Sequence, residues 1–288
     1  MKKNFQIWTV IVFVLFLFPV IIQLIPEESK ISNSKIIKEN ALIVYASNVV
    51  EEEKTEPEPE PEPEVIEEPE TTAGKVLLYF THSHEAYEPM TKAADGKIAV
   101  SHQHQTENVM KMGEKLKSLL QINGVETEML EVDNMKELAK KNLPYYRAYD
   151  AIRPYVKNRL SEKEYDLIID IHRDAVGREK TTLVHGGEKY AKVAFVVGMD
   201  HPGYKNNEMM TNRLKTVMEN RIPGITRDVI PKGGAGVDGK YNQDLHPNII
   251  LVELGGVGNS EDELNRTVAI IAESVSELLN EVNEAEEK

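Results

Sequence analysis

The sequence contains no cysteine in 288 residues, and several well-known catalytic motifs are missing as well. Without cysteine no disulfide can staple the fold, but the 215 residues from Gly74 onward are enough for a hydrophobic core that does without one. The GxSxG motif, the P-loop and the dinucleotide-binding glycine motif are absent, so serine-nucleophile, nucleotide and hydride-transfer chemistry have no support. No internal repeat occurs.

The chain has fewer positive than negative side chains: 34 Lys and Arg against 48 Asp and Glu, for a net charge of −14. Residues 51 to 72 hold eleven Glu and one Lys and so contribute −10 of this charge. The rest of the chain is therefore only mildly acidic, at about −4, and nothing in it indicates nucleic-acid binding.

The chain begins with an apolar run at residues 7 to 25, preceded by Lys2 and Lys3. This length matches the roughly 20 residues that cross a bilayer core. We therefore expect a transmembrane anchor at residues 1–25 in a single-pass cell-membrane protein, with the rest of the chain extracytoplasmic. A cleaved signal peptide is the alternative, but it would have a shorter apolar core and a small-residue cleavage site.

Residues 26–73 form an acidic segment rich in Pro and Glu. Alternating Pro and Glu favours extended polyproline II, since proline blocks helix formation and like charges repel. At about 3.1 Å per residue, the part from residue 51 to 72 would span roughly 70 Å. We expect a disordered, extended linker that leads to one catalytic domain at residues 74–288.

From Gly74 onward short apolar strands alternate with amphipathic helices. This pattern predicts an α/β fold, a single layered domain with a mainly parallel or mixed sheet and helices on both faces. The expected strands are residues 76–80, 125–132, 167–171, 181–184, 190–198 and 248–254; the expected helices are residues 106–121, 145–161 with a kink or break at Pro154, 207–221 and 260–282. Functional groups in such sheets gather at the carboxyl ends of the strands.

The first candidate site is THSHEAY at residues 81–87, which follows the apolar run KVLLYF. His82 and Glu85 are three residues apart on a loop, so an imidazole nitrogen and a carboxylate can turn to one point, as zinc requires. Taken alone, the motif is more typical of a solvated turn.

The second candidate is DIHRDA at residues 170–175, where His172 follows a buried strand. Asp170, Arg173 and Asp174 flank it, and burying so much charge is costly without partners. A metal ion would be such a partner, and a neighbouring carboxylate would orient the imidazole.

The third candidate is Glu253, which interrupts the apolar strand of HPNIILVELGG. Strand alternation either places it on a solvated face or sets its carboxylate beside a metal-bound water as general base. The three segments lie at successive strand ends, and together they favour a metal hydrolase.

The remaining candidates carry weaker signals. His84 is an alternative to His82, although neighbouring side chains point in different directions. His102 and His104 lie in a polar loop where solvation is the default. Glu107 at a helix start either complements the positive helix end or replaces Glu85 as the acidic ligand.

Five ordered blocks make the chain similar to the stage II sporulation protein P family over residues 76 to about 265. These blocks are THSHEAY, ENVMKMGEKL, YYRAYDA, DIHRDA, and ILVELGG followed by Asn259. DIHRDA and the order of the blocks are specific to the family, whereas each other block alone is not. Ala86 stands where the family commonly has serine, and His84 fills a variable slot.

The resemblance implies a membrane-anchored zinc N-acetylmuramoyl-L-alanine amidase, a peptidoglycan hydrolase with an added endopeptidase action on cross-linked stem peptides. It implies partners as well, a lytic transglycosylase and a membrane protein during engulfment of the forespore. By the same resemblance His82 and His172 are zinc ligands and Glu253 is the general base. Glu85 is the acidic ligand or a close neighbour of the metal, with Glu107 as its rival.

In the mechanism expected from these assignments, Arg173 aids zinc in stabilising the oxyanion, while Asp170 or Asp174 supports the ligands. Two other functions remain open. A zinc carboxypeptidase has a similar ligand order and would trim stem peptides, and a non-catalytic wall-binding module would keep the fold without hydrolysis.

Overall fold

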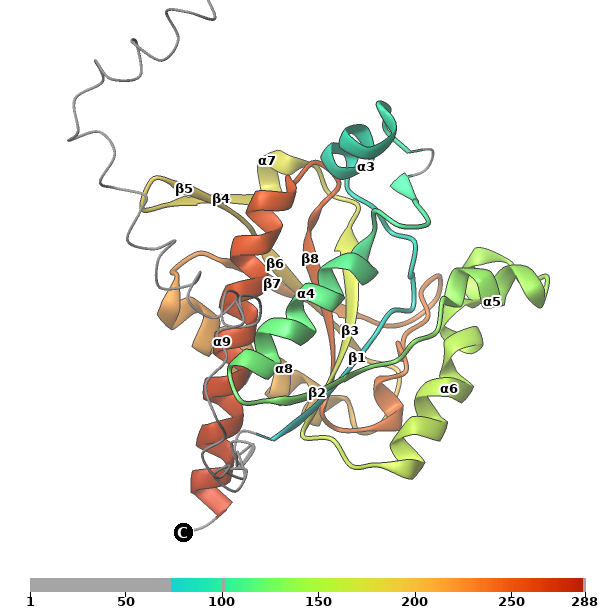
Figure 1. Ribbon diagram of the computed structural model, residues 1–288. Coiled ribbons are helices and arrows are strands. Elements are labelled where there is room, and N and C mark those ends of the chain that lie inside the picture. Colours follow the sequence, from blue (N-terminus) through green and yellow to red (C-terminus); the bar gives the residue numbers. More distant parts are fainter. Residues whose placement is uncertain (1–73, 100–101, 287–288) are drawn as a thin grey trace, which may run out of the picture. The chain divides into compact units, whose positions relative to one another are not determined.

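The computed structural model describes residues 74–99 and 102–286. A six-stranded sheet with the order β2-β1-β3-β8-β6-β7 forms its centre, and β4 and β5 pair as a separate hairpin (Figure 1). The strands are β1 (Lys75–Tyr79), β2 (Glu126–Met129), β3 (Leu167–Asp174), β4 (Thr182–His185), β5 (Glu188–Ala191), β6 (Val193–Gly198), β7 (Thr226–Lys232) and β8 (Ile249–Gly256).

Helices and short turns connect these strands. The α-helices are α3 (Glu88–Asp95), α4 (Val109–Ile122), α5 (Asn134–Lys140), α6 (Ala148–Glu162), α7 (Arg178–Thr181), α8 (Tyr204–Arg221) and α9 (Glu261–Glu286), and the 3-10 turns are η3 (Tyr145–Arg147) and η4 (Gln243–Leu245).

The sheet is mixed, as the sequence predicts. Strands β2, β1, β3 and β8 are parallel neighbours, whereas β6 runs antiparallel to β8 and parallel to β7. Because β1, β3 and β8 point the same way, their carboxyl ends meet at one edge of the sheet. This edge brings together the three segments in which the sequence places candidate site residues.

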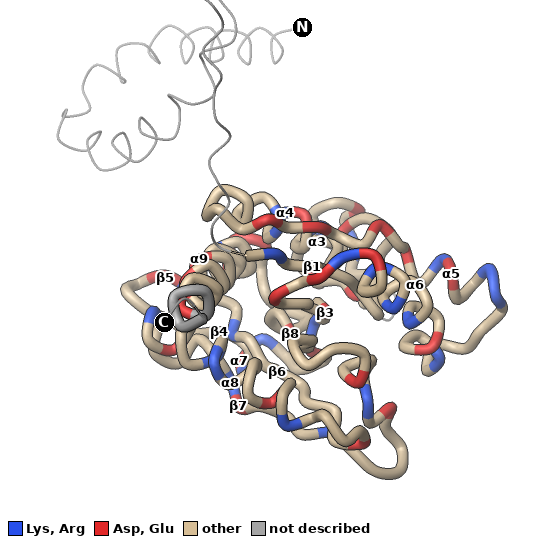
Figure 2. Tube along the Cα trace, turned by 90° about the horizontal axis from the view of Figure 1, so that it is seen from below, with Lys and Arg blue, Asp and Glu red and all other residues tan. Residues whose placement is uncertain are grey.

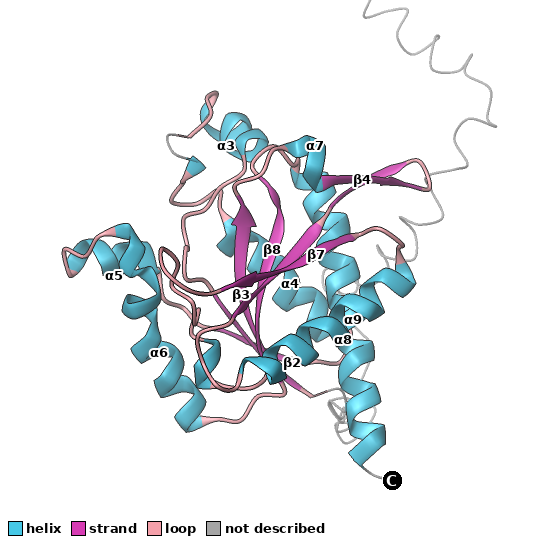
Figure 3. Cartoon of the chain, turned by 180° about the vertical axis from the view of Figure 1, so that it is seen from behind, coloured by secondary structure: helices cyan, strands magenta, loops and turns pink. Residues whose placement is uncertain are grey.

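Alternate residues of the strands enter two hydrophobic clusters on opposite faces of the sheet. Val76 and Leu78 of β1 join the larger cluster with α4, α8 and α9, while Leu77 and Tyr79 join the smaller one with α6. Figure 3 shows strands β3 and β8 with α6 beside them and α4 behind. The predicted helices on both faces are therefore present.

Some local predictions differ from the structure. Helices α3 and α5 and strand β7 were not expected from the sequence, and the expected strand over residues 190–198 is two strands that divide at Lys192. Helix α6 continues through Pro154 without ending, so of the two expected alternatives the break is wrong, and the kink stays a prediction. The irregularity lies earlier, where the 3-10 turn η3 leads into α6.

Charge is mixed over the surface of the described residues. Figure 2 shows lysine and arginine interspersed with aspartate and glutamate along α4, α5 and α6. This distribution agrees with the near balance of charge outside the acidic segment, since a nucleic-acid interface would gather cations on one face.

The predicted single-pass membrane location is corrected by the structure. Within residues 74–99 and 102–286, no helix is both long and apolar enough to cross a bilayer. Even α9, the longest of them, carries charged side chains along its length. Residues 1–25 and 26–73, the predicted anchor and linker, lie outside the described residues.

Candidate metal centre

His82 and Glu85 lie on the loop that leaves β1. The amide of Glu85 donates to the carbonyl of His82 over 3.0 Å, which closes a tight turn. This turn sets Nδ1 of His82 3.2 Å from Oε1 of Glu85. The buried Tyr87 holds the far end of the loop, because its hydroxyl donates to the carbonyl of Leu254 over 2.8 Å.

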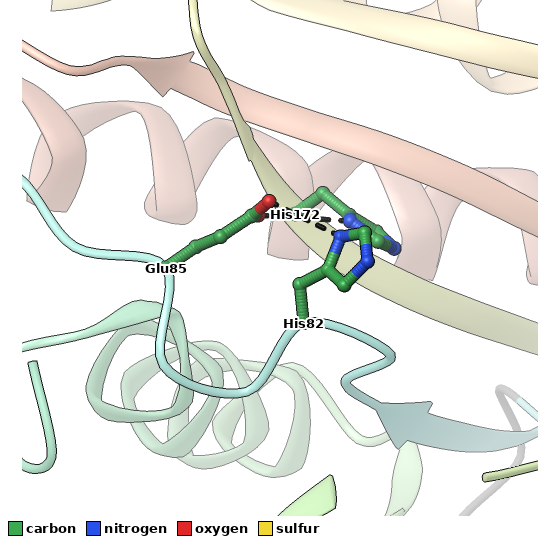
Figure 4. Close-up of side chains that lie close together, drawn as sticks. All are labelled: His82, Glu85 and His172. Carbon is green, nitrogen blue, oxygen red and sulfur yellow. Dashed lines mark ion pairs between the residues drawn. The ribbon is translucent and has the colours of Figure 1, made fainter. Parts of the chain in front are cut away.

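His172 approaches the same carboxylate from the neighbouring strand. Its Nδ1 lies 3.6 Å from Oε2 of Glu85, and only 3% of its side chain is exposed. Figure 4 shows both imidazoles turned toward Glu85. The ligand atoms that His82, Glu85 and His172 offer all lie within 4.8 Å of one another.

This donor set fits zinc. Two imidazole nitrogens and one carboxylate are a common catalytic zinc set that leaves a further position open. The backbone amide of Arg173 donates to Oε2 of Glu85 over 2.8 Å and so fixes the carboxylate. The structure therefore contains a cluster suited to a metal, and within the described residues this is the one group of its kind.

The electrostatics of the cluster favour a cation among its members. Burial alone would raise the pKa of Glu85, but its hydrogen bonds with His172 and His82 hold that pKa far below the usual range. Burial likewise acts to lower the pKa of His172, yet the carboxylates of Asp170 and Glu85 raise it well above the ordinary value. A protonated imidazole thus supplies positive charge at the place where a metal ion would otherwise provide it.

Asp170 lies behind His172 on the same strand and is fully buried. It accepts hydrogen bonds from the amide and hydroxyl of Thr81, at 2.9 and 2.6 Å. Its Oδ2 lies 3.0 Å from Nε2 of His172, on the side of the ring away from Glu85, although the two atoms do not have hydrogen-bond geometry. Asp174, the other carboxylate considered for this support, instead pairs with Arg227.

Glu253 lies beside His172 on the next strand. The two residues are Cα partners in the parallel pairing of β3 and β8, and their side chains therefore share a face of the sheet. Oε2 of Glu253 is buried and has no hydrogen-bond partner. Burial raises the pKa of Glu253 to about 7, and the carboxylates of Glu85 and Asp174 add to this rise against the opposing effect of His172. A carboxyl group with that pKa can both take up and release a proton near neutral pH.

Arg173 is buried next to the cluster, with 7% of the residue exposed. Its guanidinium donates to the carbonyl of His102 over 3.2 Å, whereas its Nε has no partner. It also lines the cleft described below. The side chain thus has a free donor beside the candidate metal ligands.

The alternative candidates lie outside the cluster. Glu107 pairs with Lys111 over 2.8 Å at the start of α4. His84 points to Asp133, and His104 points to Asp95, each over 2.9 Å. His102 lies 3.4 Å from Glu88. Of the residues weighed from the sequence, the structure brings Glu85 rather than Glu107 beside the two histidines.

Comparison with known proteins decides the family. A family model described as stage II sporulation protein P (SpoIIP) matches residues 20–276. The chain belongs to the stage II sporulation protein P family. Stage II sporulation protein P of Bacillus subtilis (strain 168) is 38% identical over 213 residues, which are 73% of this chain and 52% of that protein. The chain therefore spans about half the length of the curated relative it matches.

Solved structures with some likeness to this SpoIIP chain are more distant. The CwlD amidase of Clostridioides difficile, solved in complex with the GerS lipoprotein, is 14% identical with a TM-score of 0.47 over 74% of this chain and 98% of that one. Murine aminoacylase 3 is 15% identical with a TM-score of 0.42 over 73% of this chain and 66% of that one. Likenesses at this distance do not assign a function.

The site also includes aromatic residues that the sequence did not predict there. Tyr145 stacks on His82 with ring centroids 4.6 Å apart and an angle of 15°, and Tyr149 meets the edge of His82 at 5.6 Å. Tyr241 meets Tyr149 at 5.0 Å from a loop far along the chain. The block YYRAYDA marked this region as a family motif, but nothing in its spacing showed that its rings would face the histidines.

These side chains line a cleft of about 890 Å³ over the sheet. The candidate ligands and Glu253 lie along it, Leu251 and Val196 contribute apolar surface, and the loop at residues 236–241 adds a further wall. This volume lies at the upper end of the range of ligand-binding clefts in proteins, about 300 to 1,000 Å³.

Proposed function

We propose that this chain is a peptidoglycan hydrolase that uses zinc to cleave the N-acetylmuramoyl-L-alanine amide. The observation that carries the proposal is the convergence of His82, Glu85 and His172 beside Glu253, a carboxyl group whose pKa is about 7, within one cleft. Membership of the SpoIIP family supports the substrate class. Zinc-type donor sets of this kind serve hydrolysis of amide bonds.

His82, Glu85 and His172 would hold the zinc, which supplies Lewis acidity that activates a water molecule and polarises the scissile carbonyl. Glu253 then accepts a proton from the attacking water and later delivers it to the leaving nitrogen. Arg173 has an unpaired Nε beside the ligands and is the chain's own donor for the negative charge that develops on the carbonyl oxygen. Asp170 keeps the ring of His172 in place throughout.

The wider role that we propose follows the family. The protein would act in removal of septal wall during engulfment in sporulation, together with a lytic transglycosylase and a membrane protein partner. The same centre would also cut cross-linked stem peptides, since both reactions are amide hydrolyses and need the same proton transfers at Glu253.

The experiment that tests this proposal compares Glu253→Gln with wild-type protein. The variant should keep its zinc, measured by elemental analysis, because Glu253 is not among the proposed ligands. It should lose peptidoglycan hydrolysis by about 10²-fold or more, because glutamine cannot take up the proton. Mass spectrometry of the products distinguishes muramoyl-amide cleavage from carboxypeptidase trimming.

Glu107→Gln is the matched control, since Glu107 pairs with Lys111 outside the cluster. It should retain both zinc and activity. If the Glu253→Gln protein hydrolyses peptidoglycan at the wild-type rate, Glu253 is not the general base. Protein without bound zinc and without product would favour a non-catalytic wall-binding module.

A further inference from the structure

The two residues directly after His82 point away from the metal cluster and toward Asp133. The hydroxyl of Ser83, which is fully buried, donates to Oδ1 of Asp133 over 2.9 Å. Nε2 of His84 lies 2.9 Å from Oδ2 of the same carboxylate. Asp133 thus engages both side chains of the loop between the proposed ligands His82 and Glu85.

The residues after Asp133 continue this attachment at the start of α5. The Nδ2 group of Asn134 donates to the carbonyl of Thr81 over 2.8 Å and to the carbonyl of Ala148 over 2.9 Å. The amide of Met135 donates to the hydroxyl of Ser83 over 3.1 Å. Three consecutive residues of α5 and its N-cap therefore fasten the loop from Thr81 to His84, and Asn134 also joins it to the first turn of α6.

The other side of the same loop is held by backbone hydrogen bonds. The amide of His104 donates to the carbonyl of His84 over 2.9 Å, and that of Val109 donates to the carbonyl of Glu85 over 2.8 Å. The loop is thus fixed on two sides. Only one side, the one at Asp133, is fixed through side chains that can be changed without altering the backbone.

A purely local role for Asp133 would be to cap α5. Its Oδ1 does accept from the amide of Lys136 over 3.2 Å, as an N-cap side chain does. Capping needs only one oxygen, however, and it does not need His84. The carboxylate also engages His84, whose Nε2 lies 2.9 Å from both Oδ1 and Oδ2, although Oδ2 pairs with Nζ of Lys136 over 2.9 Å as well. His84 stands directly before the proposed ligand Glu85 and two residues after His82.

We propose that Asp133 is a positioning residue which, through Ser83 and His84, sets the directions of His82 and Glu85 and so the affinity of the site for a divalent metal. Asp133 and His84 do not touch the metal in this arrangement. Residues that orient metal ligands in this way typically change metal affinity by 10- to 100-fold when they are mutated. The inference rests on the proposed zinc site but not on the nature of the substrate.

The test uses two substitutions that separate positioning from capping. Asp133→Asn keeps an oxygen that caps α5, since asparagine caps helices as well as aspartate does, but places an amide against either Ser83 or His84. His84→Leu removes the contact from the other side and leaves the cap intact. Zinc affinity is measured by competition with a chromogenic chelator, and the geometry of the site by the visible absorption of bound Co²⁺.

Both variants should bind zinc about 10-fold more weakly and show an altered Co²⁺ spectrum. The thermal unfolding of the metal-free His84→Leu protein should change little, whereas Asp133→Asn also lowers the unfolding temperature because it removes the carboxylate that pairs with Lys136. His84→Gln retains a donor near the position of Nε2 and should restore part of the affinity. Asp95→Asn is the matched control: it breaks the equivalent pair with His104, also at 2.9 Å, and should leave zinc affinity within about 2-fold.

Wild-type zinc affinity and an unchanged Co²⁺ spectrum in both variants would overturn the inference. A second outcome is that the wild-type protein binds zinc, the variants bind it more weakly, and the wild-type protein cleaves no peptidoglycan. In that case the positioning role stands and the proposed function fails. If the wild-type protein binds no divalent metal, both fail.

Discussion

At the scale of single residues, Glu253 occupies an unfavourable environment. Oε2 of its carboxylate is buried without a hydrogen-bond partner, and burial together with Glu85 and Asp174 raises the pKa of the group to about 7. In the unfolded chain the group has a pKa near 4.5. The folded protein therefore binds the proton more tightly, and the contribution of Glu253 to stability falls as the pH rises from about 4.5 to 7.

We expect Glu253→Gln to stabilise the metal-free protein at pH 8, where the wild-type carboxylate is charged, by about 1–2 kcal/mol. At pH 5, where the folded wild type is protonated, the substitution should have little effect. Urea unfolding of chelator-treated protein at the two pH values measures the difference, with the exposed Glu188→Gln as control. A stabilisation of equal size at pH 5 and pH 8 would contradict the raised pKa.

At the scale of elements, the turn from β8 into α9 holds a buried carboxylate, Glu263, whose pKa is lowered, in contrast to the raised pKa of Glu253. Ser260 and Glu263 cap α9 reciprocally: the amide of Ser260 donates to Oε2 of Glu263 over 3.1 Å, and the amide of Glu263 donates to Oγ of Ser260 over 3.3 Å. Asn259 also donates to Oε2 of Glu263 over 2.9 Å, and Arg178 pairs with Oε1. Burial acts to raise the pKa of Glu263, but these contacts outweigh it and lower that pKa.

A lowered pKa means that Glu263 stabilises the fold above pH about 4.5, and that this contribution is lost as the pH falls through its folded pKa. Glu263→Gln should destabilise the protein by about 1 kcal/mol at pH 7 and by clearly less at pH 3. Thermal unfolding at both pH values measures this, with Asp262→Asn, an exposed neighbour in the same helical turn, as control. An effect that does not depend on pH would show that the charge of Glu263 is unimportant.

Elements with a strong hydrophobic period were the ones that the sequence predicted. The cores of β1, β3 and β8 and the helices α4, α8 and α9 were found within a few residues. Helix α5 was missed because it has seven residues and buries only Asn134 and Leu138. Strand β7 was missed because it is an edge strand with several exposed positions and Pro231, which edge strands tolerate.

At the scale of the whole molecule, the order of strands could not be read from the sequence. The placement of β8 between β3 and β6 makes Glu253 the partner of His172. From the sequence, titratable residues within apolar strands or directly after them identified His82, Glu85, His172 and Glu253 as candidates, because buried charge is costly without a partner. The tyrosines around them gave no such signal, since aromatic residues are ordinary in any core and their proximity depends on tertiary packing.

The strand order also determines how the cleft extends across the sheet. In the pairing of β8 with β6, Glu253 lies opposite Ala194 and Leu251 opposite Val196, and in the pairing of β6 with β7, Gly198 lies opposite Lys232. Glu253 and Lys232 are thus two strands and four residue steps apart, or about 16 Å. Both line the cleft, and an extended peptide of about four to five residues covers that distance.

Lys232 is exposed and makes no ion pair with any described residue, whereas Arg147 on the opposite wall already pairs with Asp150. If the substrate is a stem peptide, as we propose, an unpaired cation at that distance is suited to a carboxylate on its far part. Lys232→Met should raise KM for a pentapeptide substrate with a free carboxylate about 3- to 10-fold, with little change in kcat.

Two variants serve as controls for this prediction. Lys232→Arg should retain the wild-type KM. Lys240→Met replaces an exposed lysine that does not line the cleft, and it should not change KM. The increase in KM caused by Lys232→Met should disappear for a substrate amidated at that carboxylate and for a muramoyl dipeptide too short to reach Lys232. An equal increase in KM for all of these substrates would show that Lys232 does not recognise the carboxylate.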